Sequence, residues 1–552
     1  MFMTRSIFLF FSLFISFSQC KKEEIQAATS FELLSIQYHN KISGSTIFLE
    51  EQQPSISFLF NHKLDKNTTQ KAIVFRSTKA IDIPFTFSFD HNDSALIISP
   101  TQNLETLSKY YLVLTKDLQN SQKTKLNNYI NLELFSFIDT IKTAFPNISD
   151  DSLLTLIQKQ TFRYFWDFGH PVSGLSRERN SSGNICTSGG SGFGIMSILV
   201  AVNNGFISRR EGIQRIKTIL DFLKNKTKKY HGAFPHWFNG ADGSTIPFSS
   251  YDDGGDLVET SYLMMGLLCA RQFFNGASTD EKLIQDQVNL LYKNVEWSYY
   301  QNGQDVLFWH WSENYAWKMN HRIQGWNEAL ITYILAASSP TFPISASVYK
   351  NGWAKNGGIK NGRSFFNYTL PLGEDYGGPL FFSHYTFLGV DPNGLKDEYA
   401  DYSIQVKNHS LINYEYCKSK TNITFGYSDQ CWGLTASDTY NGYTAHSPTN
   451  DKGVISPTAA ISSLPFTHEE SMKAIRYFYF ILGEKLWKEY GFIDAFSLEK
   501  NWFADSFLAI DQGPIIVMIE NHKSKLLWNL FTSCPEVNDG MKKLGFTAPY
   551  IK

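Results

Sequence analysis

The hydrophobic pattern of this chain changes its period near residue 150, and this change constrains the fold more than any other feature. From about residue 27 to 140, short apolar or alternating runs recur between polar turns, which is typical of strands. The runs are FELLSIQY, SISFLFNH, AIVFRS, FTFSFD, ALIISP, YYLVLT and INLELFSF. After residue 150, apolar residues recur every three to four positions, as on one face of a helix. The sequence therefore predicts an all-β region followed by a helical region.

The fold class predicted is an N-terminal Ig-like β-sandwich over 21–140, a linker over 141–150 and an all-α domain over 151–548. Composition supports the division, because all 12 Trp and 36 of the 37 Gly follow residue 150. The length of 552 residues is also more than one ordinary domain accommodates. The β region contains no cluster of catalytic residue types, so we expect it to act as a spacer.

Eight helices are expected in the second region: 151–168, 208–226, 256–274, 279–300, 326–338, 398–407, 467–490 and 513–524. Capping boxes at Ser208/Glu211, Ser278/Glu281 and Thr467/Glu470 predict three of the helix starts. Long loops rich in Gly, Trp and Asn separate the helices. This alternation favours a helical barrel whose loops build a cleft at one end.

Charge and cysteine content exclude several classes of partner. The chain has 50 basic and 52 acidic residues, which leaves no electrostatic footprint for nucleic acid or for a polybasic membrane surface. The five cysteines after Cys20 show neither zinc-ligand spacing nor a disulfide framework. We expect them to be buried and apolar, with a Cys417–Cys431 bridge as the alternative. No cofactor or metal is expected, and the protein is expected to be a monomer.

The N-terminus, MFMTRSIFLFFSLFISFSQC, has one Arg followed by an apolar run that is too short to span a membrane. The run ends at Cys20, which predicts a lipoprotein signal peptide over 1–20 with lipid on Cys20; ordinary signal-peptide cleavage is the alternative. The following Lys21-Lys22-Glu23-Glu24 resembles a surface-export tether of Bacteroidetes lipoproteins. These features predict an exported lipoprotein at either face of the outer membrane.

Three carboxylates crowd the segment YDDGGDLVE before an apolar helix. Asp256 and Glu259 are three residues apart on one helical face, and Asp252 lies just ahead of them. Crowded carboxylates raise the pKa of at least one member, as a general acid at neutral pH requires. The alternative is structural, because acidic residues at a helix start also cap the helix and complement its dipole.

Two further acids stand in similar contexts. Glu328 follows Trp326 in QGWNE, where an indole can keep a carboxyl partly desolvated. Asp511 lies at a Gly-Pro helix start in AIDQGP. The alternative for Glu328 is a cap of the helix that follows. The Gly-rich segment 187–194 is expected to be a loop that supplies donors and tight turns, and it lacks the Lys-Ser/Thr of a phosphate loop.

Long segments of the second region resemble one bacterial family. They are YFWDFGHPVSGLSRER, TSGGSGFGIMSI, YDDGGDLVETSYLMMGLL, QGWNEALITYILAASSPT, GGPLFFSHYTFLGVDP, YNGYTAHSPTNDKGVISPTAA and residues 499–515. They resemble the glycoamylase-like domain of glycoside hydrolase family 144, over about 150–535. The β region similarly resembles the bacterial Ig-like modules that precede catalytic domains in surface enzymes.

The resemblance implies an (α/α)6 barrel that hydrolyses β-1,2-glucan with inversion at the anomeric carbon. It maps the family's important acids onto Asp252, Asp256, Glu259 and Glu328, and Asp511 is a further acid in a segment that resembles the family. We expect Glu328 to be the general acid and Asp511 or Asp252 the base. The expected substrate-binding residues are Asp167, Arg177, Arg179, Trp237, Trp309, His310, Trp311, Trp326, Tyr376, His384, Trp432 and Tyr443.

Five of the tryptophans, Trp237, Trp309, Trp311, Trp326 and Trp432, are expected to present their indoles to sugar rings, because they lie in loop-like or acid-bearing stretches.

Trp297 and Trp487 are expected to be core residues, because they lie on apolar helical faces. Two alternatives to a β-1,2-glucanase stay open: a surface glycan-binding protein without turnover, and a hydrolase of another glucan such as an α-glucan. The sequence does not distinguish endo from exo action.

Overall fold

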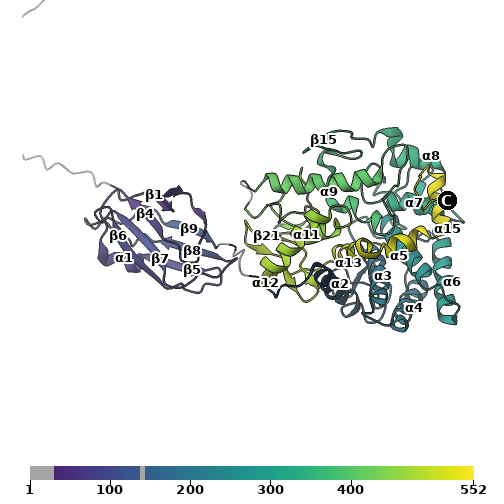
Figure 1. Cartoon of the computed structure of the whole chain (residues 1–552), viewed down its shortest axis with the longest axis horizontal. Helices are drawn as coiled ribbons and strands as arrows, with labels where there is room; N and C mark the ends of the chain where they lie inside the picture. Colours follow the sequence, from purple (N-terminus) through teal and green to yellow (C-terminus); the bar gives the residue numbers. More distant parts are fainter. Residues whose placement is uncertain (1–29, 137, 139–142, 422, 424) are drawn as a thin grey trace, which may run out of the picture. The chain divides into compact units, whose positions relative to one another are not determined.

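The structure, a computed structural model, describes residues 30–136, 138, 143–421, 423 and 425–552 (Figure 1). The chain divides into two compact units, Met1–Ile138 and Asp139–Lys552, and each is described by itself. Cys20 and the predicted signal peptide lie outside the described residues. Every helix in the described part of the chain is too short or too polar to cross a bilayer.

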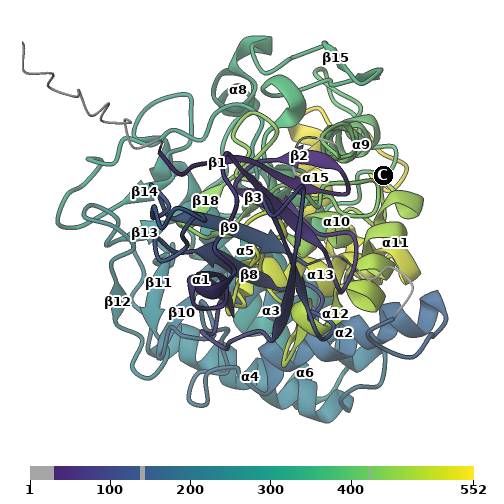
Figure 2. The ribbon, with the colours of Figure 1, turned by 90° about the vertical axis from the view of Figure 1, so that its left-hand side faces the viewer.

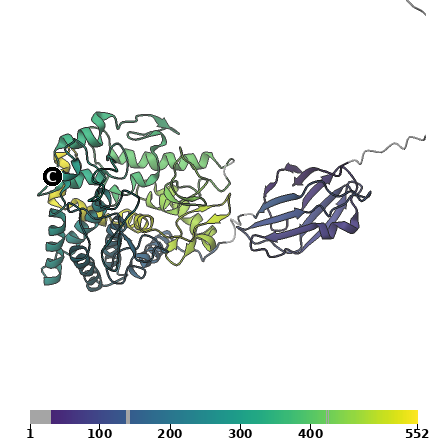
Figure 3. The same ribbon diagram turned by 180° about the vertical axis from the view of Figure 1, so that it is seen from behind.

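The first unit is a β-sandwich (Figures 1 and 3). One sheet has the strand order β2-β1-β4-β7-β6 and the other β3-β9-β8-β5. All seven predicted runs are strands. The strands are β1 Leu33–Tyr38, β2 Lys41–Ser43, β3 Thr46–Phe48, β4 Ile56–Phe60, β5 Ile73–Ser77, β6 Phe85–Asp90, β7 Ala95–Pro100, β8 Lys109–Leu114 and β9 Ile130–Phe135, with one helix, α1 Lys66–Ala72.

Alternation explains how these strands form a sandwich. In β4 the side chains of Ile56, Phe58 and Phe60 are buried while the residues between them are partly exposed. Because successive side chains of a strand point to opposite faces, one face of each sheet is apolar. The two apolar faces meet in a shared core that includes Phe58 of one sheet and Leu112 of the other.

The second unit is mainly helical (Figure 2). Its helices are α2 Asp150–Trp166, α3 Ser188–Asn203, α4 Arg209–Asn225, α5 Leu257–Phe273, α6 Thr279–Lys293, α7 Leu330–Ser338, α8 Ala346–Val348, α9 Tyr402–Ser419, α10 Pro457–Ser462, α11 His468–Arg476, α12 Gly483–Leu486, α13 Ala509–Ser524, α14 Leu526–Thr532 and α15 Pro535–Lys543. Each of the eight predicted ranges overlaps a helix, although α9 extends beyond the range 398–407 and α13 begins before the range 513–524. The range 467–490 holds α11, a π-helical turn Tyr477–Ile481 and α12.

Helix α3 contradicts the prediction of a loop over 187–194. It begins at Ser188, inside the Gly-rich segment, and is buried from Ser188 to Ala201. The glycines serve packing, because α3 crosses α5 with backbones in near contact. A Cβ on Gly192 would lie 2.1 Å from the carbonyl oxygen of Tyr262, and one on Gly266 would lie 2.2 Å from that of Gly192. The low helix propensity of glycine is outweighed by burial.

Two of the three predicted caps are present. Ser208 and Glu211 form a reciprocal capping box, and the Ser278 hydroxyl accepts from the Glu281 backbone N–H. The third predicted helix start is correct, because Thr467 is the N-cap residue of α11, but its side chain makes no capping hydrogen bond. Its hydroxyl donates instead to the carbonyl oxygen of Ser463 at 3.3 Å, one turn earlier.

The five described cysteines, Cys186, Cys269, Cys417, Cys431 and Cys534, are all free and buried. This confirms the prediction of buried apolar residues and rules out the Cys417–Cys431 bridge. Burial raises the pKa of the Cys186 thiol to about 12, so the thiolate is disfavoured.

Candidate active site

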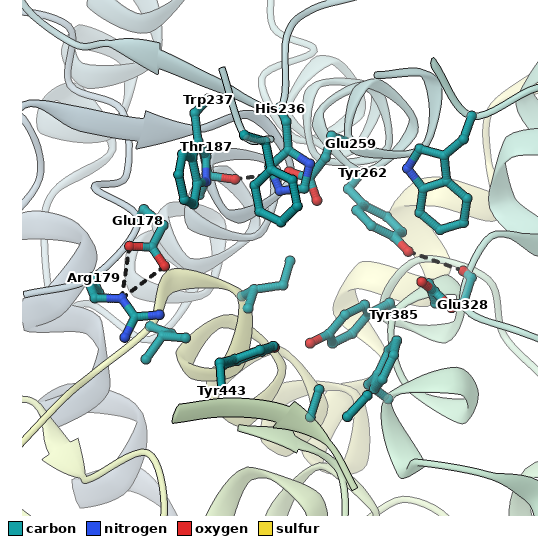
Figure 4. A pocket seen from close by; sticks show the side chains of 17 residues that line it. Glu178, Arg179, Thr187, His236, Trp237, Glu259, Tyr262, Glu328, Tyr385 and Tyr443 are labelled. Atoms are coloured by element: carbon teal, nitrogen blue, oxygen red, sulfur yellow. Dashed lines mark hydrogen bonds and ion pairs between the residues drawn. The ribbon is translucent and has the colours of Figure 1, made fainter. Parts of the chain in front are cut away.

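A cavity of about 390 Å³ opens in the helical unit (Figure 4). Residues from the starts of α5 and α13, from the segment before α7 and from the hairpin of β17 (Ala436–Thr439) and β18 (Gly442–Ala445) line it. The lining residues are Glu178, Arg179, Thr187, His236, Trp237, Phe248, Glu259, Tyr262, Trp309, Glu328, Phe381, Tyr385, Ala436, Tyr443, Ala445, Leu508 and Ile510. Acids and aromatic rings together make it the candidate active site.

A short antiparallel ladder brings two of the predicted segments together. Strand β13 Gly255–Asp256 pairs with β14 His310–Trp311, so Asp256 lies opposite His310 (Figure 2). Glycine is required at the approach, because a Cβ on Gly254 would lie 2.1 Å from the carbonyl oxygen of Trp311. The segment 252–259 and the Trp-rich segment 309–311 therefore form one wall.

Asp256 serves both as a helix cap and as a member of the site. Its Oδ1 accepts from the backbone N–H of Glu259 at 2.9 Å, which caps α5. Its Oδ2 accepts from Nδ1 of His236 at 2.9 Å and from Nε1 of Trp309 at 3.1 Å. The structural interpretation, a cap of α5, is therefore confirmed through one oxygen, while the other oxygen contacts two residues of the cavity lining.

Glu259 is fixed by the start of α3. Its Oε2 accepts from the Thr187 hydroxyl at 2.9 Å (Figure 4). The same oxygen accepts from the backbone N–H of Gly189 at 2.6 Å. Burial raises the pKa of Glu259, while His236 opposes the rise. The Gly-rich segment thus contributes donors to the site as expected, although from a helix rather than from a loop.

Asp252 is the acid of this group with the least support from hydrogen bonds. It is 6 % exposed, and within the described residues no donor reaches its Oδ1. Nε2 of His310 lies 3.3 Å from that oxygen, but the same Nε2 accepts from the backbone N–H of Gly254 at 3.0 Å. Burial and the neighbouring Asp256 raise the pKa of Asp252 to about 7.

Glu328 lies across the cavity from this wall. Its backbone carbonyl accepts from the hydroxyls of Thr386 at 2.8 Å and Tyr262 at 3.4 Å, which fixes the segment before α7. Burial raises the pKa of its carboxyl to about 7, and Asp256 and Glu259 add to the rise. The alternative role as a helix cap is not observed, since the N-cap of α7 is Ala329 and no described side chain caps it.

Asp511 does not line the cavity. It is 1 % exposed in the first turn of α13, and its Oδ1 lies 3.5 Å from the hydroxyl of Tyr385, which does line the cavity. Burial and the neighbouring Asp494 raise its pKa well above the usual range. Tyr385 therefore links Asp511 to the cavity.

Four of the predicted binding residues line the cavity: Arg179, Trp237, Trp309 and Tyr443. His310 and Trp311 lie beside it in β14.

The prediction that Trp326 and Trp432 face sugar is wrong. Trp326 is 7 % exposed and packs on Phe387 and Tyr402. Trp432 is 0 % exposed and packs on Tyr414. Their position near Gly and acidic residues did not reveal that helices cover them.

Four other predicted residues lie away from the lining. Asp167 pairs with Arg163 at the end of α2. Arg177 places its guanidinium over the Phe168 ring. The side chain of His384 is buried against the Ser463 hydroxyl at 3.0 Å.

Tyr376 packs on Phe365 in a separate small cluster, with its backbone at φ 64°. The prediction that Trp297 is a core residue is confirmed, because its side chain is fully buried. Trp487 is partly exposed and packs on Tyr479 and Phe492.

Sequence reasoning missed His236, Phe248, Tyr262 and Tyr385. The ring of Phe248 stacks on that of His236 with centroids 4.0 Å apart. His236 could have been predicted from the segment FPHWFN, because it directly precedes Trp237, which was predicted to bind sugar. Tyr262 and Tyr385 lie in apolar segments that resemble buried core, so nothing in the sequence marks them.

His236, Asp252 and Asp256 are also the described residues that could hold a metal ion, because their ligand atoms lie within 4.8 Å of one another. Protein donors already occupy both oxygens of Asp256. A cation there would compete with these hydrogen bonds.

The His236 imidazolium predicts a pH-dependent stability. Burial alone would lower its pKa, but the carboxylates of Glu259, Asp256 and Asp252 outweigh burial and raise it from 6.5 to about 9. A raised pKa stabilises the fold fully below the unfolded value and loses that effect as pH rises through the folded value. The free energy of unfolding should therefore fall between pH 6.5 and 9, by at most about 3 kcal/mol.

Urea unfolding of the wild type and His236→Gln at several pH values measures this fall. The variant should lose most of the pH dependence in that window. Equal pH dependence of the two proteins would contradict the assignment of the proton to His236.

Comparison with known proteins places the chain in a family. A family model described as "Putative glucoamylase" matches residues 320–535, and a bacterial Ig-like domain model matches 42–138. An exo β-1,2-glucooligosaccharide sophorohydrolase (non-reducing end) of Parabacteroides distasonis is 43 % identical over 425 residues, which is 73 % of this chain. The match spans 59 % of that relative's length.

Two solved structures match the helical unit over their whole length. One from Bacteroides uniformis, also described as a glucoamylase, is 54 % identical with a TM-score of 0.73 and covers 74 % of this chain. The other, an endo-β-1,2-glucanase of Chitinophaga pinensis in complex with sophorotriose and glucose, is 50 % identical with a TM-score of 0.72 and covers 73 %. Each match covers 100 % of the relative's chain. The chain therefore belongs to the bacterial glycoamylase-like family, glycoside hydrolase family 144, and carries an Ig-like domain ahead of its helical domain.

Proposed function

We propose that this chain hydrolyses β-1,2-linked glucan with inversion at the anomeric carbon. The observation that carries the proposal is Glu328, a carboxyl in the wall of an aromatic-lined cavity whose pKa is raised to about 7. A general acid works best when its pKa lies near the working pH. The printed activities of the P. distasonis and C. pinensis relatives supply the glucan linkage.

The residues divide naturally into an acid side and a base side. Glu328 donates its proton to the glycosidic oxygen that leaves, while a carboxylate on the far side of the sugar takes a proton from the attacking water. Asp511, reached through Tyr385, and Asp252 are the candidates for that carboxylate. Trp237, Trp309 and Phe248 offer flat apolar faces to the sugar rings.

The helical domain is, on this proposal, an (α/α)6 barrel with the cavity at one end. Support comes from the packing of α3 against α5 and α13, and from the match to the C. pinensis glucanase over its whole length. The cavity lies at the starts of α5 and α13, where loops rather than helices supply most of the lining.

The same proposal includes export and lipid anchoring. The sequence over 1–20 supports a lipoprotein signal peptide that places a lipid on Cys20. The lipid would anchor a monomeric protein to the outer membrane. The module over 21–140 and a linker over 141–150 would connect the anchor to the helical domain over 151–548. Metabolic labelling with a fatty acid tests this, because Cys20→Ser should lose the label.

A time course on linear β-1,2-glucan tests the activity. The chain from residue 27 should release short oligosaccharides, and proton NMR of the first products should show the α anomer if inversion holds. The size of the early products separates random internal cleavage from release of one disaccharide at a time. Turnover of an α-glucan without attack on β-1,2-glucan, or binding without products, would overturn the proposal.

A further inference from the structure

A pair of buried carboxyl groups, those of Asp494 and Asp511, lies beneath the cavity. The proposed reaction gives a role to Asp511 and none to Asp494. Asp494, between β20 (Gly491–Phe492) and β21 (Phe496–Ser497), is 2 % exposed, and Asp511 in α13 is 1 % exposed. Their carboxyl groups lie side by side, near enough for one to hydrogen-bond to the other once it carries a proton. No predicted motif included Asp494.

Two oxygens of this pair have no donor within the described residues. They are Oδ1 of Asp494 and Oδ2 of Asp511. The other oxygens are engaged, since Oδ2 of Asp494 accepts from the backbone N–H of Asp438 at 2.7 Å and Oδ1 of Asp511 faces the Tyr385 hydroxyl at 3.5 Å. A buried acceptor without a donor is costly, and two adjacent buried carboxylates repel. One proton held between the two groups relieves both costs.

The charged surroundings do not remove that repulsion. Asp438 also faces the pair, but Nη1 of Arg179 binds both of its oxygens at 3.2 Å, and the Ser506 hydroxyl donates to it. Glu178 takes up another nitrogen of Arg179 at 3.0 Å. Among the described residues, the titratable side chains of Tyr385 and Tyr443 also lie near the pair. Arg179 therefore gives its hydrogen bonds to Asp438 and Glu178, and its charge offsets only part of the repulsion within the pair.

We infer that Asp494 and Asp511 share one proton, and that Asp494 is the positioning residue which makes this pair the acceptor of the proton from the attacking water. This inference rests on the proposed hydrolysis. Tyr385 connects the pair to the cavity, because its hydroxyl faces Asp511 and its ring lines the cavity wall. Burial raises the pKa of Asp494 to about 7, which suits an acceptor at neutral pH.

The proton transfers balance. The water oxygen bonds to the anomeric carbon as the bond from that carbon to the glycosidic oxygen breaks, and Glu328 gives its proton to that oxygen. A water proton passes to Oη of Tyr385 while Tyr385 passes its own proton to the pair. The pair goes from one proton to two and Glu328 from one to none. Return of one proton through solvent restores both groups.

Asp494→Asn tests the shared proton. The amide cannot share a proton but can donate to the Asp511 carboxylate, which lowers the pKa of Asp511. The ascending limb of the kcat–pH profile should move down by about one pH unit or more. The plateau should fall about tenfold, because the remaining base is weaker. KM should stay within about twofold.

Asp391→Asn is the matched control, because burial also raises the pKa of Asp391, which lies outside the cavity lining. It should leave the ascending limb in place. A purely structural role for Asp494 would lower kcat equally at every pH and leave the limb unmoved, which would overturn the inference.

A second measurement covers the case in which Asp494→Asn does not fold. The substrate-free protein, labelled with carbon-13 aspartate and carrying Asp252→Asn, should show the infrared band of a protonated aspartate at about pH 6. If this band is absent, the inference is overturned, whether or not the protein hydrolyses the glucan. If the wild type cleaves no β-1,2-glucan, the proposed function fails instead, and the band still tests the shared proton.

Discussion

Replacing Glu328 by Gln is expected to lower kcat on β-1,2-glucan by about 10³-fold, with KM changed less than about threefold. The amide keeps the shape of the side chain but has no acidic proton to give to the leaving oxygen. Binding should survive, because the aromatic walls formed by Trp237 and Trp309 are untouched. Steady-state kinetics by reducing-end release measure the first effect, and calorimetric titration with a β-1,2-linked oligosaccharide measures the second.

Glu313→Gln is the matched control. Glu313 is half-exposed and pairs with Lys228 outside the cavity lining, so the kcat of the Glu313→Gln protein should equal that of the wild type. A Glu328→Gln protein that binds and hydrolyses the glucan as the wild type does would contradict the role of Glu328. Another acid would then be the proton donor, with Asp252 the first candidate because its pKa is also raised to about 7.

Gly192→Ala is expected to destabilise the helical domain by about 3–5 kcal/mol, or to prevent its folding. The added Cβ would lie 2.1 Å from the carbonyl oxygen of Tyr262 and 2.7 Å from the Cα of Leu263. Both are backbone atoms, so no side chain can rotate away and the two helices must separate. Urea unfolding followed by tryptophan fluorescence reports on this domain alone, since all 12 Trp follow residue 150.

Gly358→Ala controls for the chemistry of the substitution. Its nearest contacts for a Cβ are 3.1 and 3.4 Å, to atoms of Lys355, and its backbone is not left-handed. The free energy of unfolding should change by less than about 1 kcal/mol. A Gly192→Ala protein as stable as the wild type would mean that α3 and α5 do not cross closely.

The fold was largely predictable from period and composition. Seven strand runs and eight helix ranges follow from local alternation, which depends only on residues close in sequence. Helix α3 was not predicted, because its glycines have low helix propensity. Packing against α5, some 70 residues away in the sequence, stabilises the helix nevertheless. A pattern read along one segment does not contain that contact.

The site was predictable where function requires a rare residue type in an unusual place. Asp252, Asp256, Glu259 and Glu328 stand out as acids beside glycines and tryptophans. The structure places Glu259 and Glu328 in the cavity lining, and Asp256 behind it in contact with the lining residues His236 and Trp309. Tyr385 and Asp494 did not stand out, because their importance comes from which neighbour they touch. Trp432 stood out wrongly, since a loop-like sequence says nothing about the helices that cover it.

The five buried thiols make this protein convenient for site-specific chemistry. Because Cys186, Cys269, Cys417, Cys431 and Cys534 are all inaccessible, maleimide reagents should leave a folded chain that starts after Cys20 unmodified. One cysteine introduced on the surface of each unit would then carry the only reactive groups. Fluorophore or spin-label pairs at such positions would measure the distance between the Ig-like domain and the helical domain in solution.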